Sequence, residues 1–150
     1  MIECDECHQW QHTVCMGFFS NRDSRIPQKF VCYSCQYPKA PFKITQFLQN
    51  RCQFRRALSI IYQEGFQSQI QLSRRLGVGL RRTRRIQQQL AKEGFIQVKT
   101  GHIYDVVKNS ETRQKVKCYF LTDIDAQPDF LALMQHENYS SVSSKIPSRI

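Results

Sequence analysis

Pairs of cysteine and histidine residues with the spacing of metal ligands lie near the start of the chain. The three pairs are Cys4/Cys7, His12/Cys15 and Cys32/Cys35. A CxxC pair places two thiolates on one tight turn, where both reach a zinc ion at about 2.3 Å. Tetrahedral zinc needs two pairs, so three pairs predict one complete and one incomplete site. Residues 1–20 have cysteines and histidines where a secretory signal has its apolar core, which favours zinc over disulfides.

Catalytic chemistry finds no support in the remaining residues. The other two cysteines, Cys52 and Cys118, stand alone in apolar or strand-like surroundings, and we expect them to be buried structural thiols. No Gly-rich phosphate loop is present, and no pair of carboxylates has catalytic spacing. The sequence therefore predicts a binding protein that is not an enzyme and has no small-molecule substrate.

Positive charge is concentrated in the middle of the chain. The formal net charge is +10, and residues 68–100 carry 8 Lys/Arg against 1 Asp/Glu, whereas residues 1–37 carry 3 against 4. A concentrated cationic region favours a polyanionic partner over mere solubility. No stretch approaches the roughly 20 apolar residues of a membrane span, so no membrane partner is expected.

The elements that must position these residues fall into two parts of an α+β fold. Residues 1–37 are too few to bury a self-supporting core and need a metal to hold them together. Two prolines in residues 38–44 predict a linker. The domain predicted at residues 45–122 begins with helices at 45–62, 68–76 and 80–93, where apolar residues recur at helical spacing. Ser68 caps the second helix, and Gly77-Val78-Gly79 forms the turn before the third.

Strands are expected after the third helix. The pattern predicts strands at 96–100 and 103–107, a polar loop at 108–114 and a further strand at 115–121, where apolar and polar residues alternate. Residues 123–135 are predicted to form a short helix that packs on this domain. Residues 136–150 are Ser-rich and polar, and we expect them to be disordered.

The outward face of the third predicted helix is rich in arginine. Its inward stripe is Leu80, Thr83, Ile86 and Leu90, and no acidic residue precedes Glu93. Like charges on one helix repel, so an external anion is the natural partner, and arginine contacts phosphate or guanine bidentately. The residues predicted to bind DNA are Arg74, Arg75, Arg81, Arg82, Arg84, Arg85, Gln88, Lys108, Arg113 and Lys115. The alternative is a solvated basic face that meets an acidic protein.

The order of the metal ligands resembles a PHD finger, in which the first and third pairs share one zinc and the second and fourth pairs share the other. The run CDECHQWQHTVC matches the second and third pairs, and Phe30 takes an aromatic position where the family usually has tryptophan. The resemblance implies a complete Zn²⁺ site at Cys4, Cys7, Cys32 and Cys35. It assigns His12 and Cys15 to a second site whose first pair is expected upstream of Met1. In the other interpretation, His8 or an unrelated residue completes that second site.

Trp10 stands where methyl-lysine-reading PHD fingers place one wall of their cage, and an aromatic face attracts a cationic ammonium. This makes Trp10 a candidate for contact with a histone H3 tail. The other cage walls of such readers come from upstream residues, so a structural or docking role of the finger is favoured. A RING-type ubiquitin ligase is disfavoured, because the C-x-H-x-x-C spacing of a RING is missing.

The helix–turn–helix followed by strands resembles a winged helix-turn-helix, whose recognition helix lies in the major groove of DNA. A PHD finger joined to a winged helix resembles the chromatin-binding region of yeast-type meiotic HORMA-domain axis proteins. The segment RIPQKFVC at residues 25–32 also looks like theirs. The resemblance implies a nuclear, chromosomal protein recruited to nucleosomal DNA. The alternative is a transcription-factor or polymerase-associated winged helix with a histone-reading finger.

Overall fold

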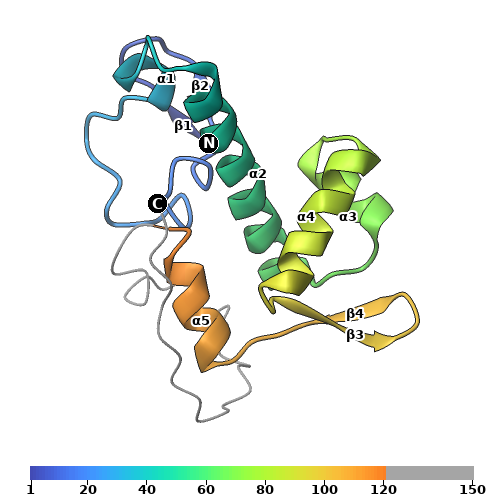
Figure 1. The fold of residues 1–150 in the computed structure, drawn as a ribbon. Coiled ribbons are helices and arrows are strands. Elements are labelled where there is room, and N and C mark those ends of the chain that lie inside the picture. The colour runs from blue at the N-terminus through green and yellow to red at the C-terminus, as the bar shows by residue number, and fades with distance from the viewer. Residues whose placement is uncertain (121–150) are drawn as a thin grey trace.

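The computed structural model describes residues 1–120, and the statements below concern this range. The predicted helix at 123–135 and the predicted disordered tail at 136–150 lie outside the described residues. The elements in chain order are β1 (Ile2–Glu3), β2 (Trp10–Gln11), α1 (Tyr33–Gln36), α2 (Phe42–Glu64), α3 (Gln69–Leu76), α4 (Leu80–Lys92), β3 (Ile96–Thr100), β4 (Ile103–Val106) and α5 (Ser110–Lys117). Figure 1 shows them in space.

The N-terminal segment of about 37 residues is a small unit of loops that we call the finger. Its regular structure is limited to the antiparallel pair β1–β2 and the single-turn helix α1. Its core consists of cysteines and a few apolar side chains: Cys4, Cys15, Met16, Phe18, Phe30 and Cys32. Such a small core agrees with the expectation that a metal must hold this segment together.

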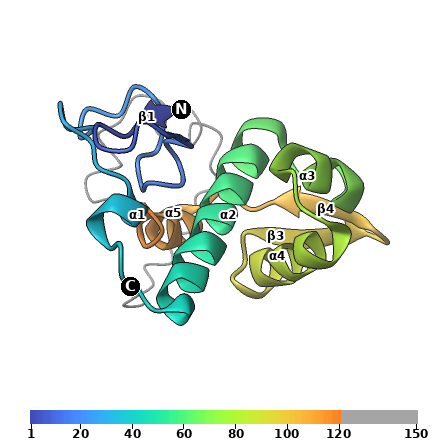
Figure 2. The ribbon, with the colours of Figure 1, turned by 90° about the horizontal axis from the view of Figure 1, so that it is seen from above.

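The long helix α2 separates the finger from the other helices. Figures 1 and 2 both show the finger and α5 on one side of α2, and α3 and α4 on the other. The helix begins at Phe42, directly after Pro41, whose φ of −58° suits a residue that precedes a helix. The linker is therefore shorter than the predicted range 38–44. Gly65 ends the helix at φ 78°, a conformation that glycine adopts readily.

The turn between α3 and α4 follows the prediction. The Ser68 side chain accepts a hydrogen bond from the Gln71 backbone N–H at 3.1 Å and caps α3. Gly77 ends α3 in the left-handed conformation, with φ 68°. In α4, Thr83, Ile86 and Leu90 are buried as predicted. Leu80 is not: it lies in the first turn of α4 and stays about half exposed.

The predicted third strand at 115–121 is wrong. Strands β3 and β4 pair antiparallel as a two-stranded sheet, but Ser110–Lys117 form helix α5. The Asn109 side chain accepts from the Thr112 backbone N–H at 2.9 Å, and Thr112 Oγ1 accepts from the Asn109 N–H at 2.9 Å, which is a capping box. Thr112, Val116 and Tyr119 recur at helical spacing and are buried, so the helix buries the residues that also fit a strand pattern.

One apolar core joins the helices to the finger. It includes Phe54, Leu58, Ile86, Leu90 and Phe95 from the helical part, and Phe19 from the finger. Phe19 meets Phe120 edge to face, with ring centroids 5.4 Å apart. None of the helices within residues 1–120 combines the length and apolarity needed to cross a bilayer.

Candidate metal centre and cationic face

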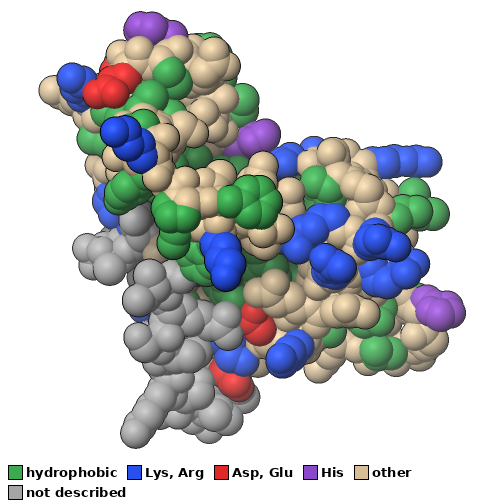
Figure 3. Space-filling model, turned by 45° about the horizontal axis from the view of Figure 1, so that its top comes forward, with side chains coloured by type: hydrophobic (Ala, Val, Ile, Leu, Met, Phe, Trp, Pro, Cys, Tyr) green, Lys and Arg blue, Asp and Glu red, His purple; other side chains and the backbone are tan. Residues whose placement is uncertain are grey.

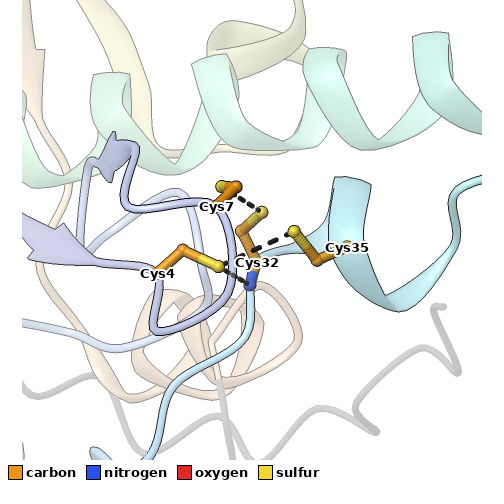
Figure 4. A group of neighbouring side chains, drawn as sticks. All are labelled: Cys4, Cys7, Cys32 and Cys35. Atoms are coloured by element: carbon orange, nitrogen blue, oxygen red, sulfur yellow. Dashed lines mark hydrogen bonds between the residues drawn. The ribbon is translucent and has the colours of Figure 1, made fainter.

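Four cysteine sulfurs converge in the finger. Figure 4 shows Cys4 and Cys7, from the segment after β1, facing Cys32 and Cys35 at the start of α1. The four sulfur atoms all lie within 4.8 Å of one another, and the pairs Cys4–Cys35 and Cys7–Cys32 are 3.8 Å apart. A tetrahedron with arms of about 2.3 Å has edges of about 3.8 Å, so the cluster fits one zinc ion. Within residues 1–120 it is the one group of three or more potential ligand atoms gathered this closely.

Backbone hydrogen bonds hold the two halves of this cluster together. The Cys32 N–H donates to the Cys4 sulfur at 3.3 Å. The Asp5 N–H donates to the Phe30 carbonyl at 2.8 Å, and the Phe30 N–H donates to the Asp5 carboxylate at 2.6 Å. Hydrogen bonding from the backbone N–H of Cys7 lowers the pKa of Cys4 to about 6. Cys4 is therefore held as the thiolate, the form that binds metal.

His12 and Cys15, predicted to belong to the second metal site, lie outside this cluster. Cys15 instead faces Cys52 of helix α2. The Cys52 sulfur donates to the Cys15 carbonyl at 3.2 Å, and the Cys15 sulfur to the Cys52 carbonyl at 3.6 Å. Partial burial and the nearby charge of Arg56 lower the pKa of His12, which favours its neutral form. Cys52 and Cys118, expected to be buried, are both partly exposed.

Trp10 lies on β2 opposite Glu3, and 60% of its surface is exposed. Trp10 is not among the side chains of the finger's apolar core. His8, the alternative ligand for the second site, is exposed, and its Nδ1 lies 3.4 Å from Oε1 of Glu3.

Helices α3 and α4 present most of the predicted DNA-binding residues to solvent. Figure 3 shows lysine and arginine side chains gathered on the side of the molecule formed by these helices. The predicted DNA-binding residues that are exposed on α3 and α4 are Arg74, Arg75, Arg81, Arg84, Arg85 and Gln88. We call this set the cationic face.

Two arginines of this region are held by other side chains. Arg75 is paired with Glu64, with its nitrogen 2.5 Å from the carboxylate, and hydrogen bonding from Arg75 lowers the pKa of Glu64. Arg82 is half-buried and donates through Nε to the Gln53 side chain at 2.6 Å. The other arginines of α4 are exposed, and no carboxylate within residues 1–120 forms an ion pair with them.

The remaining predicted DNA-binding residues lie elsewhere because α5 is a helix. Lys108 donates to the Tyr62 carbonyl at 3.3 Å, and Lys115 donates to the Glu93 carbonyl at 2.7 Å. Both are half-buried, as is Arg113 on α5. The tip of the β3–β4 hairpin instead carries Lys99 and His102, both exposed. Gly101 is the sequence feature that could have indicated this hairpin tip, because it takes the positive φ of 55° at the turn.

Arg55 joins the finger to the helices. It is buried, and its guanidinium donates to the Cys15 carbonyl at 2.8 Å, to the Tyr33 hydroxyl at 3.4 Å and to the Tyr119 carbonyl. Tyr33 and Cys15 belong to the finger, and Tyr119 follows α5. One side chain of α2 thus ties three segments together.

Comparisons with known proteins identify the N-terminal finger and give a likeness along nearly the whole chain. Residues 1–37 match the family model of the PhD finger domain, so the N-terminal segment is a PHD finger. Over 99% of its length the chain is 24% identical to linear element-associated protein hop1 of Schizosaccharomyces pombe, of which the match covers 28%. This match along the whole chain confirms the resemblance predicted from the sequence.

Two further similar proteins share only a short segment with the chain. Transcription factor BYE1 of Meyerozyma guilliermondii is 51% identical over 29% of this chain and 6% of its own length. PHD finger protein 20 of Homo sapiens is 50% identical over 25% of this chain and 4% of its own. The chain thus spans less than a third of each of these relatives. No solved structure matches it.

Proposed function

We propose that this chain is a chromatin-binding module in which a zinc-held PHD finger and a winged helix attach a meiotic chromosome-axis protein to nucleosomal DNA in the nucleus. The likeness to hop1 along nearly the whole chain supports the axis assignment. The PHD finger supports a place on chromatin, because its relatives include a protein named as a transcription factor. The proposed activity is binding, with no catalytic step.

The winged-helix assignment is supported by the order of elements. Helices α2, α3 and α4 precede the β3–β4 hairpin, and Gly77 forms the turn before α4. This order is typical of a winged helix-turn-helix, in which α4 is the recognition helix and the hairpin is the wing. The wing then comprises two strands, with Lys99 and His102 at its tip.

The exposed arginines of the cationic face are the observation that carries the proposal. Three exposed arginines project from α4 into solvent: Arg81, Arg84 and Arg85. Their positive charges repel one another, and no acidic residue precedes Glu93 on this helix to offset that repulsion. A phosphate backbone neutralises such a face and releases its counterions. We assign Arg74 and Arg75 to phosphate contacts, and Arg84, Arg85 and Gln88 to the groove.

The second zinc site belongs to the proposal as well. His12 and Cys15 are assigned to it, as the resemblance to a PHD finger implies. We assign the finger a structural and docking role. Contact of Trp10 with a histone H3 tail is the alternative role, and its exposed indole supports it.

The test compares binding of the chain to nucleosomes, to naked duplexes and to a histone H3 tail peptide. If the chain belongs to an axis protein, it should prefer nucleosomes. A transcription factor should instead show sequence preference on naked DNA, and a protein scaffold should show neither preference. Arg84→Glu/Arg85→Glu should weaken nucleosome binding at least tenfold at about 0.15 M salt, because each lost phosphate contact also loses counterion release.

The matched control is Arg22→Glu/Lys29→Glu, which changes the same net charge at two exposed positions of the finger. It should leave nucleosome affinity within about threefold of the original. Equal losses from both double variants would show that only net charge matters, and would contradict the assignment of α4 as the recognition helix.

A further inference from the structure

Large apolar side chains are exposed around the linker and the start of α2. Phe42 is 78% exposed, and Tyr37, Ile44 and Phe47 are each about half exposed. Neither the zinc cluster nor the cationic face uses these residues. A cluster of exposed aromatic and aliphatic side chains within about ten residues is more than the scattered exposure of a monomeric protein and marks an interaction surface.

A cavity adjoins this surface. It has a volume of about 360 Å³ and lies between the finger and α2, lined by Met16, Tyr33 and Tyr37 on one side and by Ala40, Leu48 and Cys52 on the other. This volume falls within the range of pockets that accept a ligand or a large side chain. A more open hollow, lined by Tyr37, Pro38, Pro41 and Ile44, continues it along the linker. We call the two together the linker groove.

The segment that supplies most of the groove lining carries no acidic residue. Residues 24–63 contain no aspartate or glutamate but seven lysines and arginines. Two of these, Lys39 and Lys43, are exposed and flank the groove in sequence. The segment that lines most of the groove is therefore cationic, which favours acidic partner segments over basic ones.

We propose that the linker groove binds an acidic peptide segment of a separate partner protein, with a bulky apolar side chain inserted in the cavity. The apolar lining accepts the anchor, and Lys39 and Lys43 pair with carboxylates that flank it. A DNA backbone offers no such anchor, and the groove lies at the finger and the start of α2, whereas α3 and α4 lie across α2 (Figure 2). The proposal is thus independent of the proposed DNA binding.

The test uses the full, zinc-loaded chain and an array of 12-residue peptides. Each peptide has Asp/Glu flanks and one of Phe, Trp, Leu, Ile or Met at two central positions, and matched peptides have Lys flanks or two central alanines. The tightest binder is then measured by fluorescence anisotropy. We expect at least tenfold weaker binding when its anchor becomes alanine, and at least tenfold when its flanks become lysine.

Variants of the chain locate the site. Phe42→Ser/Lys43→Glu should weaken the peptide at least tenfold, and because both side chains are exposed, zinc content and circular dichroism should not change. The matched control is Ile103→Ser/Lys99→Glu, which likewise replaces an apolar side chain by serine and a lysine by glutamate, at an exposed pair on the β3–β4 hairpin. The control should keep peptide affinity within about twofold.

Four results would overturn the proposal. The first is that the array retains no acidic peptide, and the second is that Lys-flanked peptides bind equally well. The third is self-association of the chain, seen by sedimentation and abolished by Phe42→Ser. The fourth is that a peptide of residues 121–136 binds more tightly than every array peptide. The third result would make a second copy the occupant, and the fourth would make it the chain's own C-terminal segment. Nucleosome binding is measured in parallel, since its loss or retention does not depend on this groove.

Discussion

At the scale of single residues, the finger is organised by sulfur and by one carboxylate. Cys4 is held as a thiolate by the backbone N–H groups around it, as its pKa of about 6 indicates. Elsewhere in the finger, Asp23 is buried and accepts hydrogen bonds from the Phe19 N–H at 2.9 Å and from the Arg25 side chain at 2.7 and 2.9 Å. The ionised Cys4 suits a metal site, and the hydrogen bonds of Asp23 hold the loop that carries Phe19 into the core.

Zinc binding tests the cluster. We expect Cys32→Ser to lose the zinc of the Cys4/Cys7/Cys32/Cys35 site and to unfold the finger, because a structural zinc supplies folding free energy directly. Cys52→Ser is the matched control, since Cys52 lies outside the cluster and should retain this zinc. Metal content per chain after dialysis checks both. Retention of the same zinc by Cys32→Ser would contradict the assignment.

Asp23 supplies a second prediction at this scale. Burial alone would raise the pKa of Asp23, but hydrogen bonds from the Arg25 side chain and from backbone N–H groups lower it overall. We expect Asp23→Asn to destabilise the chain by about 2–4 kcal/mol, since it leaves the buried Arg25 guanidinium without its charged partner. Denaturant unfolding of the zinc-loaded chain at pH 7 measures the effect. A change in the free energy of unfolding below about 0.5 kcal/mol would show that the Asp23–Arg25 ion pair does not stabilise the fold.

At the scale of elements, the α3–turn–α4 unit presents the arginines. Thr83, Ile86 and Leu90 bury one side of α4, so the opposite side must face solvent. The turn itself needs a residue with positive φ at Gly77 and an ordinary residue at Gly79, whose φ is −67°. The orientation of α4 against α2 is stabilised by Gln53, which binds Arg82.

The turn distinguishes its two glycines. A Cβ at Gly77 meets no atom within 4 Å, so the cost of Gly77→Ala is that of the left-handed conformation alone, about 1 kcal/mol. Gly79→Ala is the control at an equally open position with negative φ, and it should change stability by less than about 0.5 kcal/mol. Thermal unfolding of both variants compares them. Equal losses would indicate that the φ at Gly77 is not what the structure describes.

Glu64 modulates the cationic face. Its carboxylate holds Arg75, which then offers less charge to an external phosphate. We expect Glu64→Gln to raise affinity for duplex DNA about two- to fivefold and to steepen its salt dependence, because one more cation becomes available for phosphate. Gln63→Ala at the adjacent exposed position should leave both unchanged. Anisotropy titrations at several salt concentrations measure the slopes.

At the scale of the whole molecule, the finger and the helices share one core and one buried cation. Phe19 of the finger packs against Phe120, and Arg55 of α2 donates to carbonyl groups of both the finger and the segment after α5. The PHD finger is therefore held against α2 rather than joined to it only by the linker. This fixed arrangement is what forms the cavity of the linker groove.

Replacing Arg55 tests this joint. We expect Arg55→Met to destabilise the chain by about 2–4 kcal/mol, because methionine preserves the bulk of the side chain but leaves buried carbonyl oxygens without donors. Arg51→Met is the control, since Arg51 is less buried and donates to the Cys118 carbonyl. It should cost less than half as much. Proteolysis within the linker, at residues 37–41, should accelerate in Arg55→Met and remain slow in the control.

The sequence by itself determined the local features of this protein. The CxxC spacing predicted pairs of metal ligands, because two residues between ligands fix a turn whatever lies around it. The resemblance to a PHD finger implied that Cys4, Cys7, Cys32 and Cys35 form one site, and the structure brings these four together. Ser68, Gly77 and the apolar spacing of α4 predicted the helices and the turn, because caps, glycine conformations and helical periodicity act within a few residues. These signals also predicted which side of α4 carries the arginines.

The tertiary structure decided what depends on contacts distant in the chain. The pattern at residues 115–121 fits a strand as well as a helix, and packing of Val116 and Tyr119 into the common core selected α5. With that choice, Lys108 of the expected loop and Lys115 of the expected strand donate to carbonyl groups within the fold. The facing of Cys15 and Cys52, the burial of Arg55 and the linker groove likewise arise where the finger meets α2. No local pattern encodes them, because each depends on residues that are far apart in sequence and adjacent only once the chain has folded.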